Sequence, residues 1–333
     1  MQTKKSLLTI LGLAAAGALA LSGCSANSPG TGSTDAPAGD AEYTIGISQF
    51  VQHPALDATV AGFKKAFADA GVTATFDEQN SNADSVTATT IASKFAADKV
   101  DLVLAVATPS AQAAAQAITD IPILFTAVTE PLDAELVDSW EKPGGNVTGS
   151  SDLNPVAEQL ALITQVQPDA KSVGIIYSSG EANSQVQVDL AKEAAKELGL
   201  EIKESAIAES RDITQAADSL GDVDAIYVPT DNKITEALQT LIGFGESKQI
   251  PIYGAEVNQV KEGAIVTIGI DYEKLGEQTG KMALAILQDG KDPATMPVET
   301  LDELILAVNP AAAERMGVTL PEALTSKADV TVE

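Results

Sequence analysis

The chain has 333 residues, a formal net charge of −27, one histidine and one cysteine. A protein this acidic repels nucleic acid and anionic lipid headgroups, so neither is an expected partner. The residue count also disfavours metal sites built from His and Cys, and catalytic sets that pair His with Ser or Cys. We therefore expect neither a metal nor a cofactor.

The first 24 residues have the three parts of an export signal. Two lysines precede an almost wholly apolar stretch over 7–21, and two small residues come directly before Cys24. This order predicts a signal peptide over 1–23, and its small-small-Cys ending is typical of a bacterial lipobox, whose cysteine is lipidated. The alternative is an ordinary signal peptide with an incidental cysteine. We expect an exported protein, lipid-anchored through Cys24 to the outer face of the cell membrane.

Ser, Thr, Gly, Pro and Ala dominate the stretch from Cys24 to residue 42. This stretch has no apolar period and cannot bury enough surface to fold, so it is predicted to be a flexible linker. About 290 residues remain, which is more than one hydrophobic core comfortably serves and therefore suggests two lobes.

From Tyr43 onward, short apolar runs alternate with helical periods. The predicted strands of this first series are 43–48, 72–76, 102–107 and 121–126, and the predicted helices are 54–70, 85–97 and 110–118. In the helix over 54–70, Leu56, Val60, Phe63 and Phe67 share one face. Continuous apolar strands joined by amphipathic helices predict parallel sheets that are covered on both faces.

The pattern restarts after Gly144 and Gly145. Predicted strands follow at 147–151, 172–177, 200–203, 225–228, 252–254, 264–268 and 303–308, with helices at 155–166, 184–198, 212–220, 232–244 and 272–287. The prediction is an α/β protein with two doubly wound parallel-sheet lobes. Because one lobe ends late in the chain, the lobes should be joined by a multi-strand hinge. We assign 43–150 with 272–297 to one lobe and 151–271 with 298–333 to the other.

Ligands of doubly wound sheets bind beyond the carboxyl ends of the strands. The residues just after the predicted strands are rich in hydroxyls, amides and carboxylates, and no junction carries a Gly-rich phosphate-binding motif, so nucleotide binding is not expected. The predicted ligand-binding residues are Gln49, His53, Thr108, Ser110, Thr126, Ala127, Ser151, Tyr177, Glu181, Asn183, Asp231, Asn232, Tyr253 and Asp271.

Segments at these junctions also resemble a known family. HPALDA (53–58), ATPSAQAAA (107–115), FTAVTEP (125–131), PGGNVTGSSD (143–152), PTDN (229–232) and GIDYEKLGEQTG (269–280) are similar to the tryptophan/tyrosine ABC-transporter substrate-binding family. The resemblance spans 43–320 and departs at Glu130, where the family often has Asp. It implies an extracytoplasmic lipoprotein with the periplasmic-binding-protein type 1 fold. It also implies an amino acid ligand, typically aromatic, and ABC permease subunits as partners.

Each predicted site residue could also have a purely structural role. Thr108 and Ser110 could simply begin a helix, or they could bind a ligand carboxylate together with the free amides of its N-terminus. His53 could cap its helix or face the ligand. Asp231 could be an N-cap or pair with a ligand ammonium group, and Asp271 is the competing carboxylate for that role.

Hydroxyl-bearing and aromatic residues at the strand ends have the same two possible roles. Thr126 and Ser151 could satisfy local backbone groups or contact a ligand. Glu181, with its neighbour Asn183, could cap a helix. Tyr177 and Tyr253 could form the walls that stack on an aromatic ligand, or they could pack in the core.

The sequence favours a solute-binding protein that delivers an amino acid to a membrane permease. One alternative is a ligand-sensing receptor of the same fold without a transport role. A less favoured alternative is a carboxylate-based extracellular hydrolase. Acidic residues occur throughout the chain, so their presence does not support hydrolysis, and we predict that the protein is not an enzyme.

Overall fold

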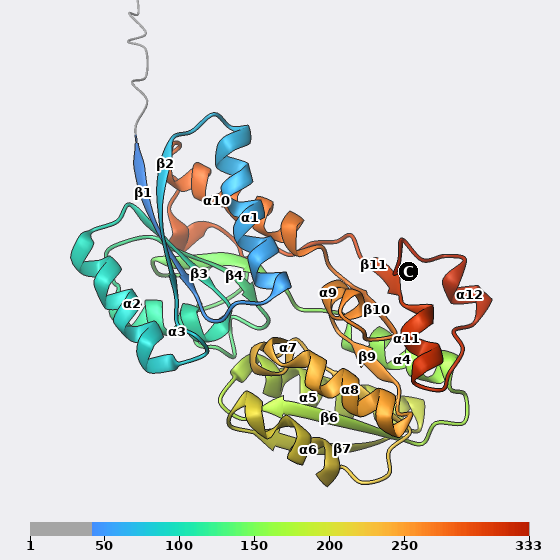
Figure 1. Cartoon of the computed structure of the whole chain (residues 1–333). Helices are drawn as coiled ribbons and strands as arrows, with labels where there is room; N and C mark the ends of the chain where they lie inside the picture. Colours follow the sequence, from blue (N-terminus) through green and yellow to red (C-terminus); the bar gives the residue numbers. More distant parts are fainter. Residues whose placement is uncertain (1–41, 333) are drawn as a thin grey trace, which may run out of the picture. The chain divides into compact units, whose positions relative to one another are not determined.

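The structure, a computed structural model, describes residues 42–332, all within one compact unit. The predictions on the signal peptide and on Cys24 lie outside the described residues. Between residues 42 and 332, no helix is both long enough and apolar enough to cross a lipid bilayer. Two halves, each built on parallel strands with helices around them, can be followed in Figure 1, and the predicted α/β class is confirmed.

The first half contains one parallel sheet with the strand order β2-β1-β3-β4-β5. Its strands are β1 (Tyr43–Gln49), β2 (Ala74–Asn80), β3 (Leu102–Val106), β4 (Ile123–Val128) and β5 (Val147–Ser151). β3 and β4 are buried along their whole length, as their continuous apolar sequences predict. All five strands run in the same direction, so their carboxyl ends meet at one edge of the sheet.

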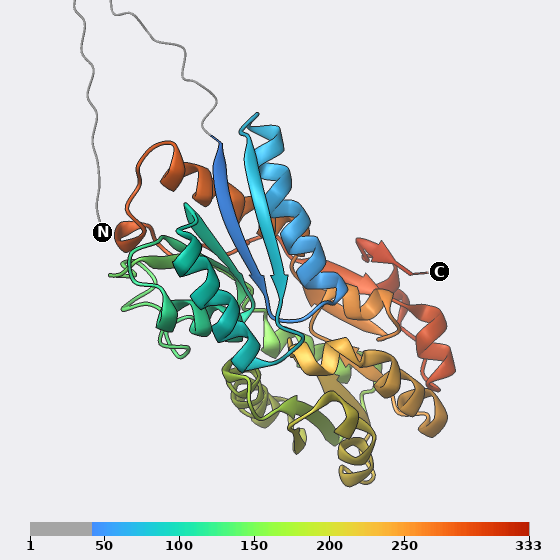
Figure 2. The ribbon, with the colours of Figure 1, turned by 60° about the vertical axis from the view of Figure 1, so that its left-hand side comes forward.

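Helices cover both faces of this sheet. α1 (Pro54–Asp69) and α10 (Tyr272–Leu287) share one hydrophobic core with the sheet, and α2 (Ser85–Asp98) and α3 (Thr108–Ala117) share another on the opposite face. α1 and α10 lie side by side although they are far apart in the sequence (Figures 1 and 2). Glycines allow this close approach, because a Cβ on Gly276 would lie only 1.9 Å from the backbone oxygen of Thr59.

The second half contains a parallel sheet with the order β7-β6-β8-β9 and a three-stranded sheet with the order β10-β11-β12. The strands are β6 (Ser172–Ser178), β7 (Glu201–Ile207), β8 (Ala225–Val228), β9 (Ile252–Gly254), β10 (Val266–Gly269), β11 (Ile305–Val308) and β12 (Val330–Thr331). The helices are α4 (Val156–Val166), α5 (Ala182–Leu198), α6 (Ile213–Ser219), α7 (Asn232–Glu236), α8 (Leu238–Lys248), α9 (Val257–Lys261), α11 (Pro310–Arg315) and α12 (Glu322–Thr325), with 3-10 turns at Ser210–Asp212 and Pro293–Thr295.

The sequence did not predict α9, α11, α12 or β12. Two further details differ from the sequence-based prediction. The helix expected over 232–244 is two helices, because Ala237 leaves the helical conformation with φ −113° and ψ 24°. β11 pairs antiparallel with β10, so the second half is not purely parallel. The pairing of Gly269 with Ile305 gives the reason, since β11 enters the second half at the point where β10 leaves it.

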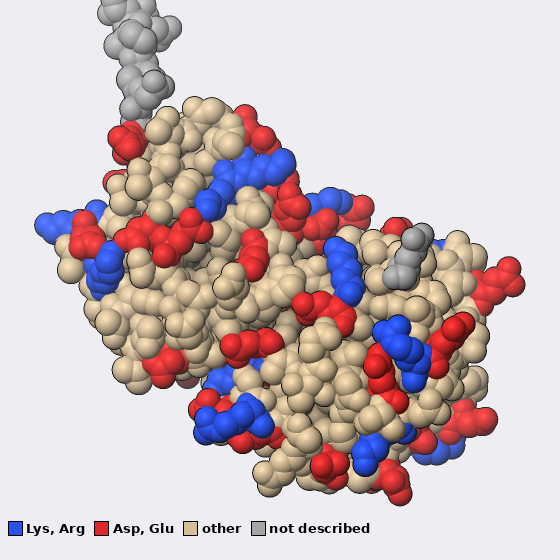
Figure 3. Space-filling view, in the orientation of Figure 1, with Lys and Arg blue, Asp and Glu red and all other residues tan. Residues whose placement is uncertain are grey.

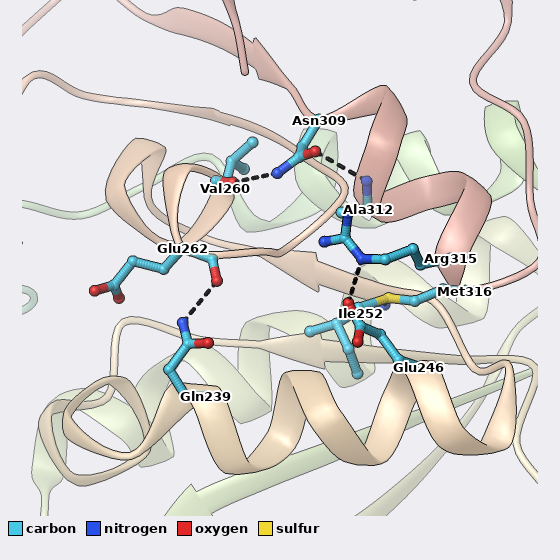
Figure 4. Close-up of polar contacts among 9 residues, drawn as sticks. All are labelled: Gln239, Glu246, Ile252, Val260, Glu262, Asn309, Ala312, Arg315 and Met316. Atoms are coloured by element: carbon cyan, nitrogen blue, oxygen red, sulfur yellow. Dashed lines mark hydrogen bonds and ion pairs between the residues drawn. The ribbon is translucent and has the colours of Figure 1, made fainter. Parts of the chain in front are cut away.

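The C-terminal segment is fixed to the second half by polar contacts that Figure 4 shows. The Asn309 side chain accepts a hydrogen bond from the Ala312 amide (2.9 Å) and donates one to the Val260 carbonyl (3.1 Å). Arg315 forms an ion pair with Glu246 of α8. Because α10 belongs to the first half and β11 to the second, the chain passes between the halves three times: after β5, after β10 and before β11.

Candidate ligand-binding site

The two halves touch where their parallel strands end. His53 follows β1, and its Nε2 lies 3.3 Å from the Oδ1 of Asn232, which follows β8. Burial lowers the pKa of His53 to about 4, although the hydrogen bond to Asn232 and the charge of Asp57 oppose this shift. The imidazole is therefore neutral at pH 7 and joins the halves as a polar, uncharged group.

Several buried polar atoms in this region have no hydrogen-bond partner within the protein. They are His53 Nδ1, Thr108 Oγ1, Asn154 Oδ1, Ser178 Oγ, Asn183 Oδ1, Glu256 Oε2 and Thr267 Oγ1. All except Thr267 lie at or just after the carboxyl ends of strands, and they come from both halves. Because folded proteins rarely leave buried polar atoms unpaired, such a group indicates a place where a polar ligand binds.

The first half presents the N-terminus of α3 to this region. Ala107 precedes the helix with φ 77° and ψ 155°, a conformation that costs energy for a residue other than glycine. Thr108 is buried and its hydroxyl is unpaired, and Ser110 is buried beside Ser48, with 3.5 Å between the two hydroxyl oxygens. A helix N-terminus offers backbone N–H groups without helical partners and a positive dipole end, so this corner suits an anion.

Four carboxylates are buried in the segments that follow the strands: Asp152, Glu181, Asp231 and Glu256. No lysine or arginine is buried within residues 42–332. Burial raises the pKa of Asp152 to about 6 and, with the charge of Asp231 as a second cause, that of Glu181 to about 8. An enclosed group of carboxylates without a cation favours a ligand that carries positive charge.

The outer surface has a different charge pattern. Figure 3 shows acidic side chains spread over the visible face of both halves, interspersed with lysine and arginine. Exposed ion pairs such as Lys64–Glu78, with 2.6 Å between nitrogen and oxygen, belong to this surface. Among residues 42–332, no group of His, Cys, Asp and Glu is arranged to hold a metal ion.

The structure gives Asp231 a demanding structural role. Its Oδ1 accepts the Ile234 amide at 3.0 Å, and its Oδ2 accepts the Ser178 amide at 2.6 Å and the Ser184 hydroxyl at 2.7 Å. Asp271 is half-buried and accepts the amides of the first turn of α10. Both sequence-based candidates for the ammonium partner are therefore occupied with capping helices.

Glu181 and Asn183 lie together with the residues of α7, as predicted for neighbours in a site. Glu181 accepts hydrogen bonds from the backbone amide and the side chain of Asn232, at 3.2 Å and 2.5 Å. Asn183 donates to the Thr230 carbonyl at 3.0 Å, which leaves its own side-chain carbonyl as an unpaired acceptor. This network positions Asn232 against His53 of the first half.

Three of the predicted residues use their polar atoms within the first half. Thr126 accepts the Thr279 hydroxyl at 3.0 Å. Ser151 donates to the Thr129 carbonyl at 2.8 Å. Gln49 donates to the Val51 carbonyl and to Asp57. These side chains fix the local structure, whereas Ala127, which has φ 54°, bends the chain where β4 ends.

The two tyrosines predicted as aromatic walls lie elsewhere. The ring of Tyr253 is buried in the core of the second half, and its hydroxyl donates to Gln167 at 2.9 Å. Gln167 in turn donates to the carbonyl of Asp224, which precedes β8, so Tyr253 points toward the amino end of the sheet. Tyr177 is half-buried against the same core, near Lys192 of α5. Both tyrosines lie within strands, so each ring packs against a face of the sheet and does not extend beyond its carboxyl end.

The structure adds residues that the predicted site did not contain. Asp152, at the first crossing between the halves, accepts the Thr129 hydroxyl at 2.9 Å and the Tyr272 hydroxyl at 3.0 Å. Asn154 and Glu256 carry unpaired acceptors. Asp152, Glu256 and Tyr272 all follow strands closely, and that position was the available signal. Asn154 lies in a loop next to a proline and gave none.

Comparison with known proteins places this geometry in context. The family model described as ABC transporter substrate binding protein matches residues 44–332. A tyrosine-binding protein from Clostridioides difficile is 42% identical over 316 residues, which cover 93% of this chain and 91% of the relative.

Two solved structures are informative together. One is the ABC domain in complex with L-Trp from Streptococcus pneumoniae, which is 35% identical, has a TM-score of 0.85, and covers 88% of this chain and 100% of its own. The other is the ligand-free, open structure of a substrate-binding protein with adhesive properties from Clostridium difficile, which is 42% identical but has a TM-score of only 0.66, with 87% and 99% covered. From sequence identity alone, the second structure would be expected to have the higher TM-score. By TM-score, the structure is therefore more similar to the L-Trp complex than to the open structure, and the fold is of the periplasmic-binding-protein type 1 kind.

Proposed function

This chain belongs to the ABC transporter substrate-binding protein family, and we propose that it binds an aromatic amino acid between its two halves and delivers it to the permease of an ABC importer. The relatives described above are binding proteins rather than enzymes, which supports a role without catalysis. A receptor of the same fold without a transport role remains the second candidate, since the same site would serve it.

The observation that carries the proposal is the chemistry of the unpaired buried atoms. The hydroxyls of Thr108 and Ser178 can donate hydrogen bonds, and the N-terminus of α3 adds positive potential, so together they suit a carboxylate. Asn154, Asn183 and Glu256 offer only acceptors, which suits an ammonium group. An α-amino acid carries both groups on one carbon atom.

An apolar cluster supports an aromatic side chain on the ligand. Phe50, Val51 and Ala107, which follow β1 and β3, belong to one buried cluster with Ile270 and Tyr272, which follow β10. The cluster adjoins Thr108 and Asp152, so a ligand held by the polar groups would place an apolar side chain near it. The relatives that bind tyrosine and L-Trp point to the same ligand class.

Ligand binding is tested by thermal unfolding of the purified protein against the twenty amino acids. A ligand at 100 times its dissociation constant stabilises a protein by about 2.7 kcal/mol, so tyrosine, tryptophan or phenylalanine should raise the melting temperature clearly and alanine should not. Uptake of the stabilising amino acid by cells with and without the protein then separates transport from sensing. Stabilisation by none of the aromatic amino acids would contradict the proposed ligand class.

We also propose that Cys24 carries the lipid anchor. Replacing Cys24 with alanine should move the protein from the membrane fraction to the soluble fraction, because stable anchoring needs more than one acyl chain and none could be attached. Ser22→Ala, which keeps a small residue in front of the cysteine, is the matched control and should stay with the membrane. A Cys24→Ala variant that sediments like the control would refute the anchor.

A further inference from the structure

The four buried carboxylates differ in how completely they are hydrogen-bonded. Asp152 and Asp231 have a donor on each of their two oxygens. Glu181 also has both oxygens paired, since its Oε1 accepts the Lys233 amide at 3.3 Å and its Oε2 accepts from Asn232. Glu256 is different: its Oε2 is the one buried carboxylate oxygen in the described chain that has no partner. Glu256 is only 1% exposed, so this oxygen is shielded from bulk solvent.

A second unpaired acceptor belongs to Asn154, close to the residue that precedes Glu256. The amide nitrogen of Asn154 donates to the Asp152 carbonyl at 3.0 Å and to the Thr230 hydroxyl at 3.4 Å, which leaves Oδ1 free as an acceptor. A Cβ built on Gly269 would lie 3.1 Å from this Oδ1 and 2.9 Å from the carbonyl oxygen of Ala255, the residue before Glu256. Asn154 Oδ1 and the carbonyl of Ala255, one residue before Glu256, therefore both lie close to Gly269.

We propose that Glu256 binds the ammonium group of the ligand and that Asn154 Oδ1 is a second acceptor for it. The inference rests on the function proposed above, because it requires an amino acid ligand. An ammonium group has three N–H donors and no acceptor, so it needs acceptor partners such as these two side chains present. Glu256 also lies at an N-cap, that of α9, but it keeps one oxygen unpaired, whereas both oxygens of Asp231 at the start of α7 are hydrogen-bonded.

The charges around Glu256 support this assignment. Those close enough to act on its titration are the carboxylates of Asp152, Asp231 and Glu262, and none is a cation. Burial, followed by these charges, raises the pKa of Glu256 well above its usual value. An ammonium group beside Glu256 would supply the counter-charge that this buried carboxylate otherwise lacks.

The test compares ligands that differ only in the amino group. Isothermal titration calorimetry would measure L-tyrosine and L-tryptophan against 3-(4-hydroxyphenyl)propionate and indole-3-propionate, which lack it. Glu256→Gln should weaken binding of the amino acid about a hundredfold, because a desolvated charge pair loses one partner. The same substitution should change binding of the desamino acid by less than about threefold, since only the amino group meets Glu256. Glu322→Gln, which removes an exposed carboxylate at the start of α12, is the matched control and should leave both affinities unchanged.

The outcomes separate the inference from the proposed function. Failure of the wild-type protein to bind any aromatic amino acid overturns the function and this assignment with it. A wild-type protein that binds, with Glu256→Gln binding equally well or losing both ligands equally, overturns the assignment alone. If Glu256→Gln does not fold, Glu256→Asp is the second variant, because it keeps the negative charge but has a side chain shorter by one methylene group. That variant should weaken amino acid binding about tenfold without affecting the desamino acid, and an equal effect on both ligands, or none on either, contradicts the proposal.

Discussion

Replacing Gly276 with alanine is expected to destabilise the protein by about 3 kcal/mol, because overpacking against rigid atoms has a high cost. The added Cβ would lie 1.9 Å from the Thr59 oxygen and 2.9 Å from the Phe63 nitrogen, and both are backbone atoms of α1. Neither can move aside as a flexible side chain would, so α10 must shift away from α1. Denaturant unfolding of the two proteins measures the difference.

Gly243→Ala is the matched control for this prediction. Gly243 also lies inside a helix, α8, but a Cβ there would have no heavy atom within 4 Å. The same methyl group should therefore stabilise the protein by about 0.5–1 kcal/mol, because alanine loses less backbone freedom than glycine on folding. Two variants of equal stability would show that the contact between α1 and α10 is not tight.

Asp231→Asn is expected to destabilise the second half by about 3 kcal/mol. Asparagine can replace the acceptor for one of the two backbone amides, those of Ser178 and Ile234, but its NH2 group must then face the other. A buried donor left without an acceptor costs about 1–3 kcal/mol, and hydrogen bonds to a charged group are lost as well. Thermal unfolding monitored by circular dichroism would report the loss.

Asp84→Asn provides the comparison for Asp231. Asp84 also caps a helix, accepting the Thr87 amide at 2.6 Å, but its side chain is exposed. Asparagine caps helices about as well as aspartate, so this variant should differ from wild type by less than about 0.5 kcal/mol. If Asp231→Asn were equally mild and amino acid binding were lost, the ammonium role would return from Glu256 to Asp231.

The sequence predicts most of the fold because short, continuous apolar runs, typical of buried strands, alternate clearly with the amphipathic periods of helices. The helix over 272–287 and the strands over 147–151, 225–228 and 252–254 have the bounds that the sequence predicted. Helix 232–244 was predicted as one element because its apolar period continues through Ala237, and only the backbone shows the break there. The strand pairing of β11 depends on where the chain re-enters the second half, which no local pattern encodes.

The sequence predicts where the candidate site lies, but not which of its carboxylates is free to bind a ligand. His53, Thr108, Glu181 and Asn232 lie where the strands of a doubly wound sheet end, and the structure brings them together. Whether a carboxylate at such a position is paired depends on donors from distant segments. Asp231 is satisfied by Ser178 and Ser184, which precede it by more than forty residues.

Within residues 42–332, four carboxylates are buried and no lysine or arginine is, which has a consequence for energy use during transport. His53 of the first half contacts Asn232, which in turn hydrogen-bonds Glu181, so this carboxylate lies close to the boundary between the halves. Burial and the charge of Asp231 raise the pKa of Glu181, so enclosing this carboxylate in its ionised form disfavours an empty closed form. An amino acid supplies the missing positive charge and removes part of this penalty. In an importer of the proposed kind, the closed shape would then report occupancy to the permease, and few rounds of ATP hydrolysis would be spent on an empty carrier.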